Sequence, residues 1–228
     1  MTTFDLSATP LRAVNEALHG LRPGLNDVVH VLNPGGRHAV AAGIDAPVTV
    51  EIEGHVGYYC AGMNQQATVV IHGNAGPGLA ENIMSGRVEA RGDASQAAGA
   101  TGQGGLIVIG GNAAARCGIS MKGVDIVVRG SVGHMSAFMA QTGRLVVLGD
   151  AGDALGDSIY EARLYVRGAV KSLGADCVEK EMLGEHKAEL AALLKEAGLA
   201  DEASPEQFRR YGSARRLYHF HIDNVGSY

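Results

Sequence analysis

The amino-acid sequence predicts an all-β fold: a single-stranded right-handed parallel β-helix of about eight 19-residue turns, with an N-terminal helix and a C-terminal helix plus tail. Three observations predict it. Glycine recurs every nineteen residues, a short apolar/polar alternation precedes each of these glycines, and nineteen residues are too few for a strand plus a crossover helix. Strands repeated this closely in one direction stack as the coils of a solenoid.

The glycine register is the strongest of these observations. At a typical glycine share of about 7 %, a run of eight evenly spaced glycines does not arise by chance. Every residue seven positions after a register glycine, from Ala42 to Ala175, is alanine or glycine. The register glycines are Gly35, Gly54, Gly73, Gly92, Gly111, Gly130, Gly149 and Gly168.

These glycines have a predicted structural role. Each turn must bend sharply out of its strand, and glycine permits positive φ and has no Cβ to collide with the adjacent turn. The alanines and glycines seven positions later predict an inward-facing corner with room for nothing larger. We therefore expect the register to form a structural glycine ladder along the molecule.

The residues before each glycine predict the strands. The positions four and two residues earlier are mostly apolar, as in Val50 and Ile52 or Ile107 and Ile109. The position directly before the glycine is mostly polar, as in Glu53. This period-two alternation predicts strands of about five residues with one face inside and one outside.

The two ends of the chain do not follow the 19-residue repeat. We divide the sequence into an N-terminal helix and lead-in (1–27), the β-helix (28–178), and a C-terminal helix with a docking tail (179–228). The first helix is predicted over 9–20, with Thr9 as its cap, Pro10 in its first turn and Gly20 at its end. The second is predicted over 178–197, and the tail from Ser204 is expected to order only against a surface.

One predicted outer face is apolar. Three positions before the register glycine, the later turns carry apolar or aromatic residues where earlier turns carry Glu51 and Glu89. An exposed strip of this kind needs a cover, either the C-terminal helix of the same chain or a partner subunit. This candidate interface consists of Val108, Val127, Val146 and Tyr165, joined by Leu106 and Leu148.

The composition excludes several function classes. The net charge of −5 and pI of about 6.0 give no electrostatic reason to expect nucleic-acid binding. The N-terminus has no signal-peptide pattern, and no apolar run approaches the ~20 residues that span a bilayer. Cys60, Cys117 and Cys177 are odd in number and contain no CxxC pair, so we expect reduced structural thiols in a cytoplasmic protein.

The sequence predicts no catalytic, cofactor-binding or metal site. No GxxxxGK[ST] occurs, and no GxGxxG joins a strand to a helix. His219 and His221 lie two residues apart, but no carboxylate or cysteine cluster completes a metal site with them. Asp150, Asp153 and Asp157 surround a glycine turn, yet the nine-residue repeat of calcium-binding β-helices is absent, so we expect solvated turn residues.

The repeated turns resemble a known family. The segments GHVGYYCA (54–61), GNAGPGLA (73–80) and GDAGDALG (149–156) look like turns of the GXGXG β-helix domain. That domain forms the C-terminal part of the glutamate synthase large subunit and also occurs as the β-helix subunit of formylmethanofuran dehydrogenase. The resemblance covers about residues 28–178, and PLRAVNEAL is similar to the helix that precedes the glutamate synthase version.

The resemblance implies a place in a larger enzyme. A β-helix without a fused amidotransferase or flavin domain resembles the three-polypeptide, glutamate synthase-like N-methylglutamate synthases, which convert methylamine and L-glutamate to N-methyl-L-glutamate and ammonia. The implied hetero-oligomer contains a class II glutamine amidotransferase-like subunit and a synthase subunit that holds FMN and an iron–sulfur cluster. In that family the β-helix supplies architecture, so the resemblance implies no catalytic residue and no cofactor in this chain.

Two alternatives remain. The chain could be the β-helix subunit of a formylmethanofuran dehydrogenase or formyltransferase/hydrolase complex, which shares the repeat. It could also be an independent enzyme, because pectin-cleaving β-helices exist. Those enzymes need clustered carboxylates on one outer face, whereas the outward charges here are mixed. The residues concerned are Glu53, Arg91, Arg129 and Arg167.

Overall fold

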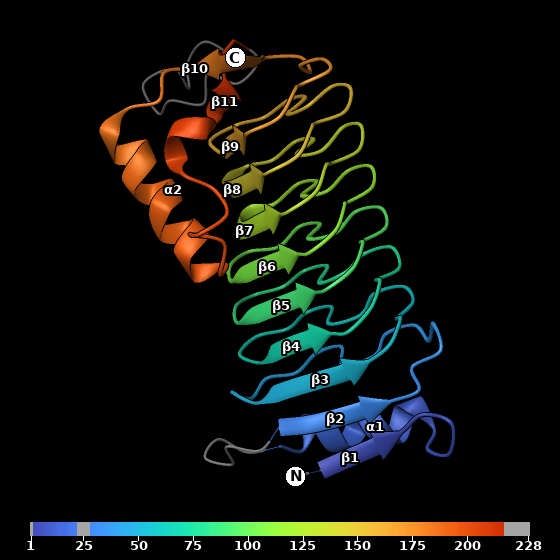
Figure 1. Cartoon of the computed structure of the whole chain (residues 1–228). Helices are drawn as coiled ribbons and strands as arrows, with labels where there is room; N and C mark the ends of the chain where they lie inside the picture. The colour runs from blue at the N-terminus through green and yellow to red at the C-terminus, as the bar shows by residue number, and fades with distance from the viewer. Residues whose placement is uncertain (1, 22–27, 217–228) are drawn as a thin grey trace, which may run out of the picture.

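The computed structural model describes residues 2–21 and 28–216, which form a rod of stacked turns (Figure 1). The described strands make one eleven-stranded sheet in the order β1-β2-β3-β4-β5-β6-β7-β8-β9-β11-β10. The strands of the rod are β2 (Val28–Leu32), β3 (Thr49–Glu53), β4 (Thr68–Ile71), β5 (Arg87–Ala90), β6 (Leu106–Ile109), β7 (Lys122–Val128), β8 (Thr142–Val147) and β9 (Arg163–Val166).

The predicted parallel solenoid with 19-residue spacing is confirmed. Each strand from β3 to β8 pairs in parallel with the next, so that Val50 lies beside Val69 and Leu145 beside Leu164. A second line of single parallel bridges runs along another side of the rod, from Val56 to Val170. Together the two lines define about seven turns, each hydrogen-bonded to its neighbours along the rod axis.

The core lies inside the turns, where the alternation predicts it. Ile107 and Ile109 of β6 are completely buried in one continuous cluster that runs the length of the rod. β-branched residues fill these positions because they pack well on a pleated surface. Consequently each turn stabilises the two turns that it touches.

The first turn departs from the predicted register. Val29, not Val31, lies beside Val50, so this step takes twenty-one residues instead of nineteen. Gly35 therefore does not stack on Gly54; instead the place of a Cβ on Gly54 lies 3.2 Å from the Pro34 side chain. An additional strand that the repeat did not predict, β1 (Thr2–Asp5), pairs in parallel with β2 and extends the sheet by one strand.

The role predicted for the register glycines is half right. Of the eight, only Gly35 and Gly54 have positive φ. From Gly73 onward the glycine is required because a Cβ would collide with the previous turn, as at Gly73, where it would lie 2.7 Å from the Gly54 carbonyl carbon. Positive φ instead falls in the small-residue corner, for example at Ala61 and Ala137, both fully buried.

The N-terminal helix closes one end of the rod. Helix α1 (Leu11–His19) is shorter than the predicted 9–20, and its N-cap is Pro10 instead of Thr9. Val14 and Leu18 are buried in the main core. Asn15 joins the helix to the first turn, since its amide donates to the Ala39 carbonyl (2.8 Å) and accepts from the Ala41 N–H (3.0 Å).

The C-terminal segment corrects the predicted helix start. Residues Cys177–Lys180 form strand β10, and helix α2 (Gly184–Glu196) begins only afterwards. A short 3-10 helix (Pro205–Gln207) leads to strand β11 (Arg209–Ser213), which inserts antiparallel between β9 and β10. The helix prediction failed at 178–180 because pairing with β11, distant in sequence, decides that conformation.

Candidate functional site

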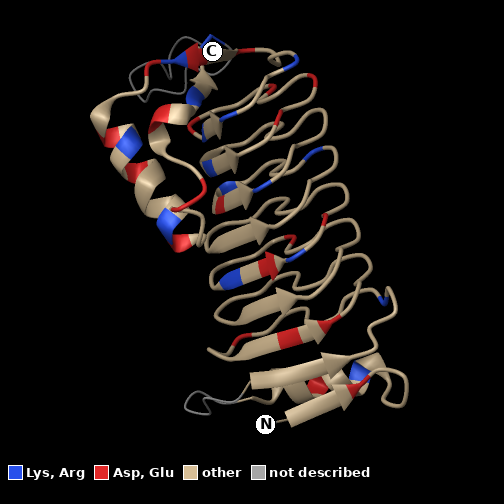
Figure 2. Cartoon of the chain, in the orientation of Figure 1, with Lys and Arg blue, Asp and Glu red and all other residues tan. Residues whose placement is uncertain are grey.

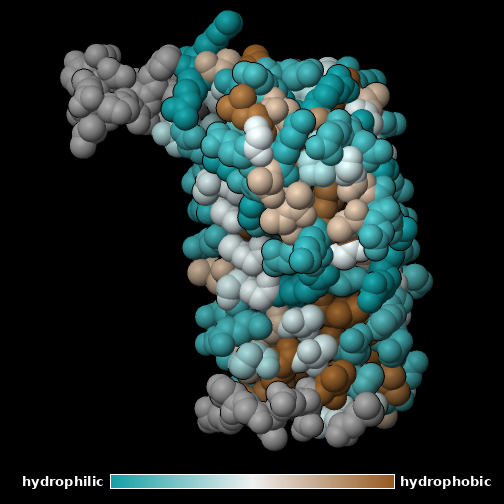
Figure 3. Space-filling model, turned by 60° about the vertical axis from the view of Figure 1, so that its left-hand side comes forward, coloured by the Kyte–Doolittle hydropathy of each residue, from teal (hydrophilic) through white to brown (hydrophobic). Residues whose placement is uncertain are grey.

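The apolar strip predicted as a candidate interface is covered by the chain itself. Strip residues Val108, Val127, Val146 and Tyr165 form a second apolar cluster with side chains from α2 and from the segment after it, which lies beside β6–β9 (Figure 1). The covering residues are Leu190, Leu193, Leu194, Ala197, Leu199, Ala203 and Phe208. From outside, this side of the upper rod presents mainly hydrophilic side chains with brown visible between them (Figure 3). The strip is therefore not a free surface for a partner.

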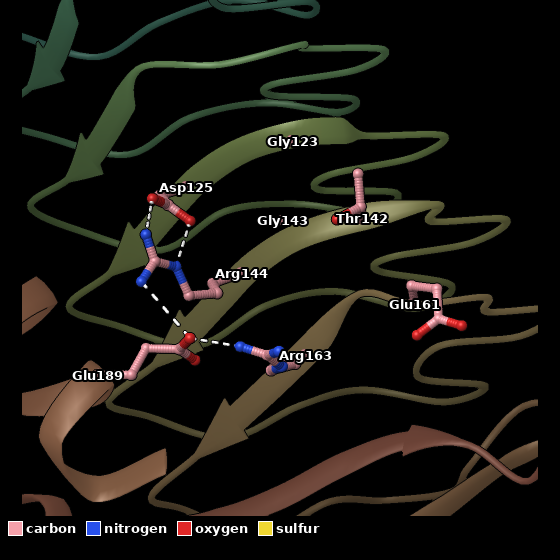
Figure 4. A pocket seen from close by; sticks show the side chains of 8 residues that line it. All are labelled: Gly123, Asp125, Thr142, Gly143, Arg144, Glu161, Arg163 and Glu189. Carbon is pink, nitrogen blue, oxygen red and sulfur yellow. Dashed lines mark hydrogen bonds and ion pairs between the residues drawn. The ribbon is translucent and has the colours of Figure 1, made fainter. Parts of the chain in front are cut away.

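A charged cleft of about 530 Å³ lies where α2 meets β7–β9 (Figure 4). Arg144 of β8 donates from Nε to Asp125 Oδ1 at 2.6 Å and makes a second, parallel bond to Oδ2. Glu189 of α2 pairs with Arg163 and lies 3.8 Å from Arg144 Nη1. Tyr165, buried beneath them, donates its hydroxyl to Glu189 Oε1 at 2.6 Å.

The hydrogen bonds and burial in this cleft hold Arg144 and Tyr165 in their usual protonation states. The hydrogen bond from Arg144 to Asp125 raises the pKa of Arg144 above its usual range. Burial and the hydrogen bond to Glu189 raise the pKa of Tyr165. Both shifts favour the forms already present at neutral pH, a charged guanidinium and a neutral phenol. The cleft is thus suited to holding α2 in place, and neither shift prepares a group for proton transfer near pH 7.

A second cleft, of about 320 Å³, lies at the C-terminal end of α2 over β5–β7. Arg87 donates to the Glu196 carbonyl oxygen (2.9 Å), and arginines favour a helix C-terminus because its carbonyls carry partial negative charge. Arg129 pairs with Glu202 at 2.8 Å. Arginines of the rod therefore fasten both ends of the covering segment.

A polar ladder that sequence reasoning missed runs beside the register glycines. From Gly54 to Gly149, the residue after each register glycine accepts a hydrogen bond from a backbone N–H of the next turn, as Asn74 does from Asp93 and Asp93 from Asn112, at 2.7–2.9 Å. The series continues through Asn112, Ser131 and Asp150. The available signal was the recurrence of His, Asn, Asp or Ser directly after the glycine. From Gly92 to Gly168 this ladder explains why the glycines lack side chains, since its polar atoms occupy the place that a Cβ would take.

The remaining candidate residues have structural partners. Asp150 belongs to the ladder, Asp153 pairs with Lys171 at 2.7 Å, and Asp157 accepts from the Ala175 N–H. Within residues 2–21 and 28–216, no group of three His, Cys, Asp or Glu side chains is arranged to hold a metal ion. His219 and His221 lie outside the described residues.

The three cysteines are buried free thiols, and burial raises the pKa of each to about 12. A thiol with so high a pKa is a poor nucleophile at neutral pH, because the reactive species is the thiolate. Cys60 and Cys117 are completely buried in the core cluster. These observations agree with the structural role expected for them.

Comparison with known proteins shows the family of the chain. No family model matches the chain. In the part of the chain that the structure describes, no helix is long and apolar enough to cross a membrane. Protein GlxC of Rhizobium meliloti (strain 1021) is 66 % identical over 229 residues, an alignment that covers 100 % of both chains. At this identity over the full length of both proteins, the chain belongs to the GlxC family.

Proposed function

We propose that this chain is a noncatalytic structural subunit of a glutamate synthase-like complex, and that the complex is an N-methylglutamate synthase. The complex would convert methylamine and L-glutamate to N-methyl-L-glutamate and ammonia. The chain would hold a class II glutamine amidotransferase-like subunit against a synthase subunit that binds FMN and an iron–sulfur cluster. The observation that carries the proposal is the stack of glycine turns from Gly54 to Gly168, because the family resemblance rests on that motif.

The use of polar groups inside the rod supports an architectural role. The side chains of the polar ladder accept hydrogen bonds from backbone N–H groups of the next turn. Asp125, Arg144, Arg163 and Glu189 hold the covering helix in place. A rod whose turns are all cross-bonded keeps its length and shape, which is what two docked subunits in fixed register require.

The test is affinity purification of the tagged chain from its native cells. The co-purifying chains would be identified by mass spectrometry, and the absorbance spectrum of the complex recorded. We expect an amidotransferase-like chain and a flavin and iron–sulfur spectrum in the same fraction. Methylamine-dependent formation of N-methylglutamate by this fraction then tests the identity of the amine.

Other outcomes contradict the proposal at different levels. A colourless chain without partners would contradict the complex altogether. Formyltransferase subunits in the fraction would replace it with the formyltransferase/hydrolase alternative. A coloured complex that forms glutamate from ammonia but is inactive with methylamine would retain the glutamate synthase-like assembly and overturn only the N-methylglutamate assignment.

A further inference from the structure

We propose that Tyr58, Tyr59, Met63 and Glu81, here called the tyrosine patch, dock an arginine or lysine side chain that projects from a partner protein. The patch lies on the turns that follow β3 and β4, away from the strip that α2 covers. This inference rests on the proposed function, because the partner is taken to be a subunit of that complex.

Direct contacts tie the patch together. The rings of Tyr58 and Tyr59 lie 5.5 Å apart between centroids and are tilted by 34°. Met63 donates its N–H to the Glu81 carbonyl oxygen at 2.8 Å, and Tyr59 donates to Pro77 of the same neighbouring turn. A Cβ placed on Gly78 would lie 2.7 Å from Glu81 Oε2 and 3.4 Å from the Tyr58 ring. The Glu81 carboxylate and the Tyr58 ring therefore lie on the same side of this turn.

The patch exposes apolar surface where several other turns carry small residues. Tyr58 and Met63 are each 48 % exposed, among the most exposed large apolar side chains of the described residues. Five positions after the register glycine, where Tyr59 stands, three other turns carry the small residues Gly78, Ala97 and Ala154, and two carry Arg116 and Met135. These positions share a positive φ, which is unfavourable for bulky residues. The backbone therefore disfavours Tyr59 there, as it disfavours Arg116 and Met135, and the Tyr59 hydroxyl accepts from Asn82 Nδ2 at 3.4 Å.

The distribution of charged residues along the chain favours a basic side chain as the group that docks at the tyrosine patch. Residues 1–84 contain seven acidic and three basic residues, whereas residues 85–228 contain seventeen and sixteen. Among the strands, β3 shows red segments, β2 and β4 show neither colour, and blue first appears on β5, although blue also marks α1 and the turn before β3 (Figure 2). Among the described residues the ion pairs of Arg and Lys lie mostly beyond residue 84, and none involves Glu81. The acidic end of the rod is complementary to a basic surface.

The chemistry of the patch fits one cation with an apolar surround. A guanidinium or ammonium over a tyrosine ring is attracted by the ring electrons, and a carboxylate beside the ring adds a charge-assisted hydrogen bond. Tyrosine and methionine are enriched at protein interfaces. An arginine flanked by apolar side chains would satisfy all of these groups together.

The experiment compares four single variants of the full-length tagged chain with the wild type. Tyr58→Ala and Glu81→Lys alter the patch. Met139→Ala is the control for an apolar side chain, because Met139 is 47 % exposed on another turn. Asp201→Lys is the control for charge, since Asp201 is exposed beyond α2. The readouts are the partner recovered with each variant and the binding of a fluorescent hexa-arginine peptide to the purified chain.

We expect both patch variants to lose at least about tenfold in partner recovery and in peptide affinity, while both controls keep wild-type values. Equal peptide binding by all five proteins would overturn the inference. So would full partner recovery by the patch variants, although the complex itself would then stand. If the wild type recovers no partner, the proposed function fails, and the peptide measurement alone decides the chemistry of the patch. A dimer of this chain that both patch variants abolish would show a second copy as the occupant and overturn the inference.

Discussion

At Gly111 the absence of a side chain is a packing requirement. A Cβ there would overlap Asp93 Oδ1, which accepts the Asn112 N–H, and would lie 3.0 Å from the Gly92 carbonyl carbon. We predict that Gly111→Ala lowers the free energy of unfolding by about 1–3 kcal/mol, the usual cost of overpacking. Urea denaturation followed by circular dichroism measures it.

The matched control for that substitution is Gly184→Ala. Gly184 begins α2, and no atom lies within 4 Å of the place that a Cβ would take there, so the change should leave stability the same or slightly higher. If Gly111→Ala unfolds at the wild-type urea concentration, the steric account of the glycine ladder is wrong.

Because of the three buried cysteines, the stability of the folded state should fall as the pH rises through the alkaline range. Burial raises the pKa of each thiol from 9.0 to about 12, so the folded state holds these protons more tightly than the unfolded state. The resulting stabilisation is fully present below pH 9 and is lost as the pH rises toward 12. We predict that Cys117→Ala reduces the loss of stability between about pH 9 and pH 11, measured by urea midpoints.

A labelling experiment checks the same burial independently. A thiol-specific chromogenic reagent at about pH 8, below the ordinary thiol pKa, should titrate none of Cys60, Cys117 and Cys177 in the native protein. It should titrate all three in guanidinium chloride. Rapid labelling of the native protein would contradict the burial on which the pH prediction depends.

Among the elements, sequence reasoning succeeded where one short pattern decides the structure. The strands β3–β9 follow from local alternation and glycine spacing, since each turn repeats the same contacts. It failed where contacts distant in sequence decide. β1 and β11 lie outside the repeat, and the 21-residue first step is visible only in the pairing of Val29 with Val50. The polar ladder was missed because His, Asn, Asp and Ser do not look alike as a pattern.

The attachment of α2 is testable at Glu189. This side chain accepts from the buried Tyr165 hydroxyl and pairs with Arg163, so Glu189→Ala leaves both without their partner. We predict a loss of about 2–3 kcal/mol, the cost of leaving a buried donor unsatisfied beside a lost ion pair. Amide hydrogen exchange should rise in α2 before it rises in β3–β5. Glu185→Ala is the control, because that side chain is 76 % exposed on the same helix; equal exchange in both variants would contradict the role of Glu189.

For the whole molecule, the critical points are the two ends of the rod. A solenoid behaves as a one-dimensional stack in which each turn depends on its neighbours, and its terminal turns need caps. Here α1 buries Val14 and Leu18 against the first turns, and β1 occupies the edge of β2. At the opposite end β10 and β11 end the parallel stack with antiparallel pairs, so the repeat stops there.

Loss of the N-terminal cap should therefore convert the rod into an aggregating species. In Val14→Asp a carboxylate replaces a completely buried side chain, at a cost of about 3 kcal/mol or more, so α1 should detach. The uncovered apolar turn and strand edge would then be free to join other chains. We predict concentration-dependent oligomers by light scattering at temperatures where the wild type shows none. Arg12→Ala, on the exposed side of the same helix, should behave as the wild type, because Arg12 contributes only a surface pair with Glu16. A monomeric Val14→Asp protein with wild-type stability would show that α1 is not a cap.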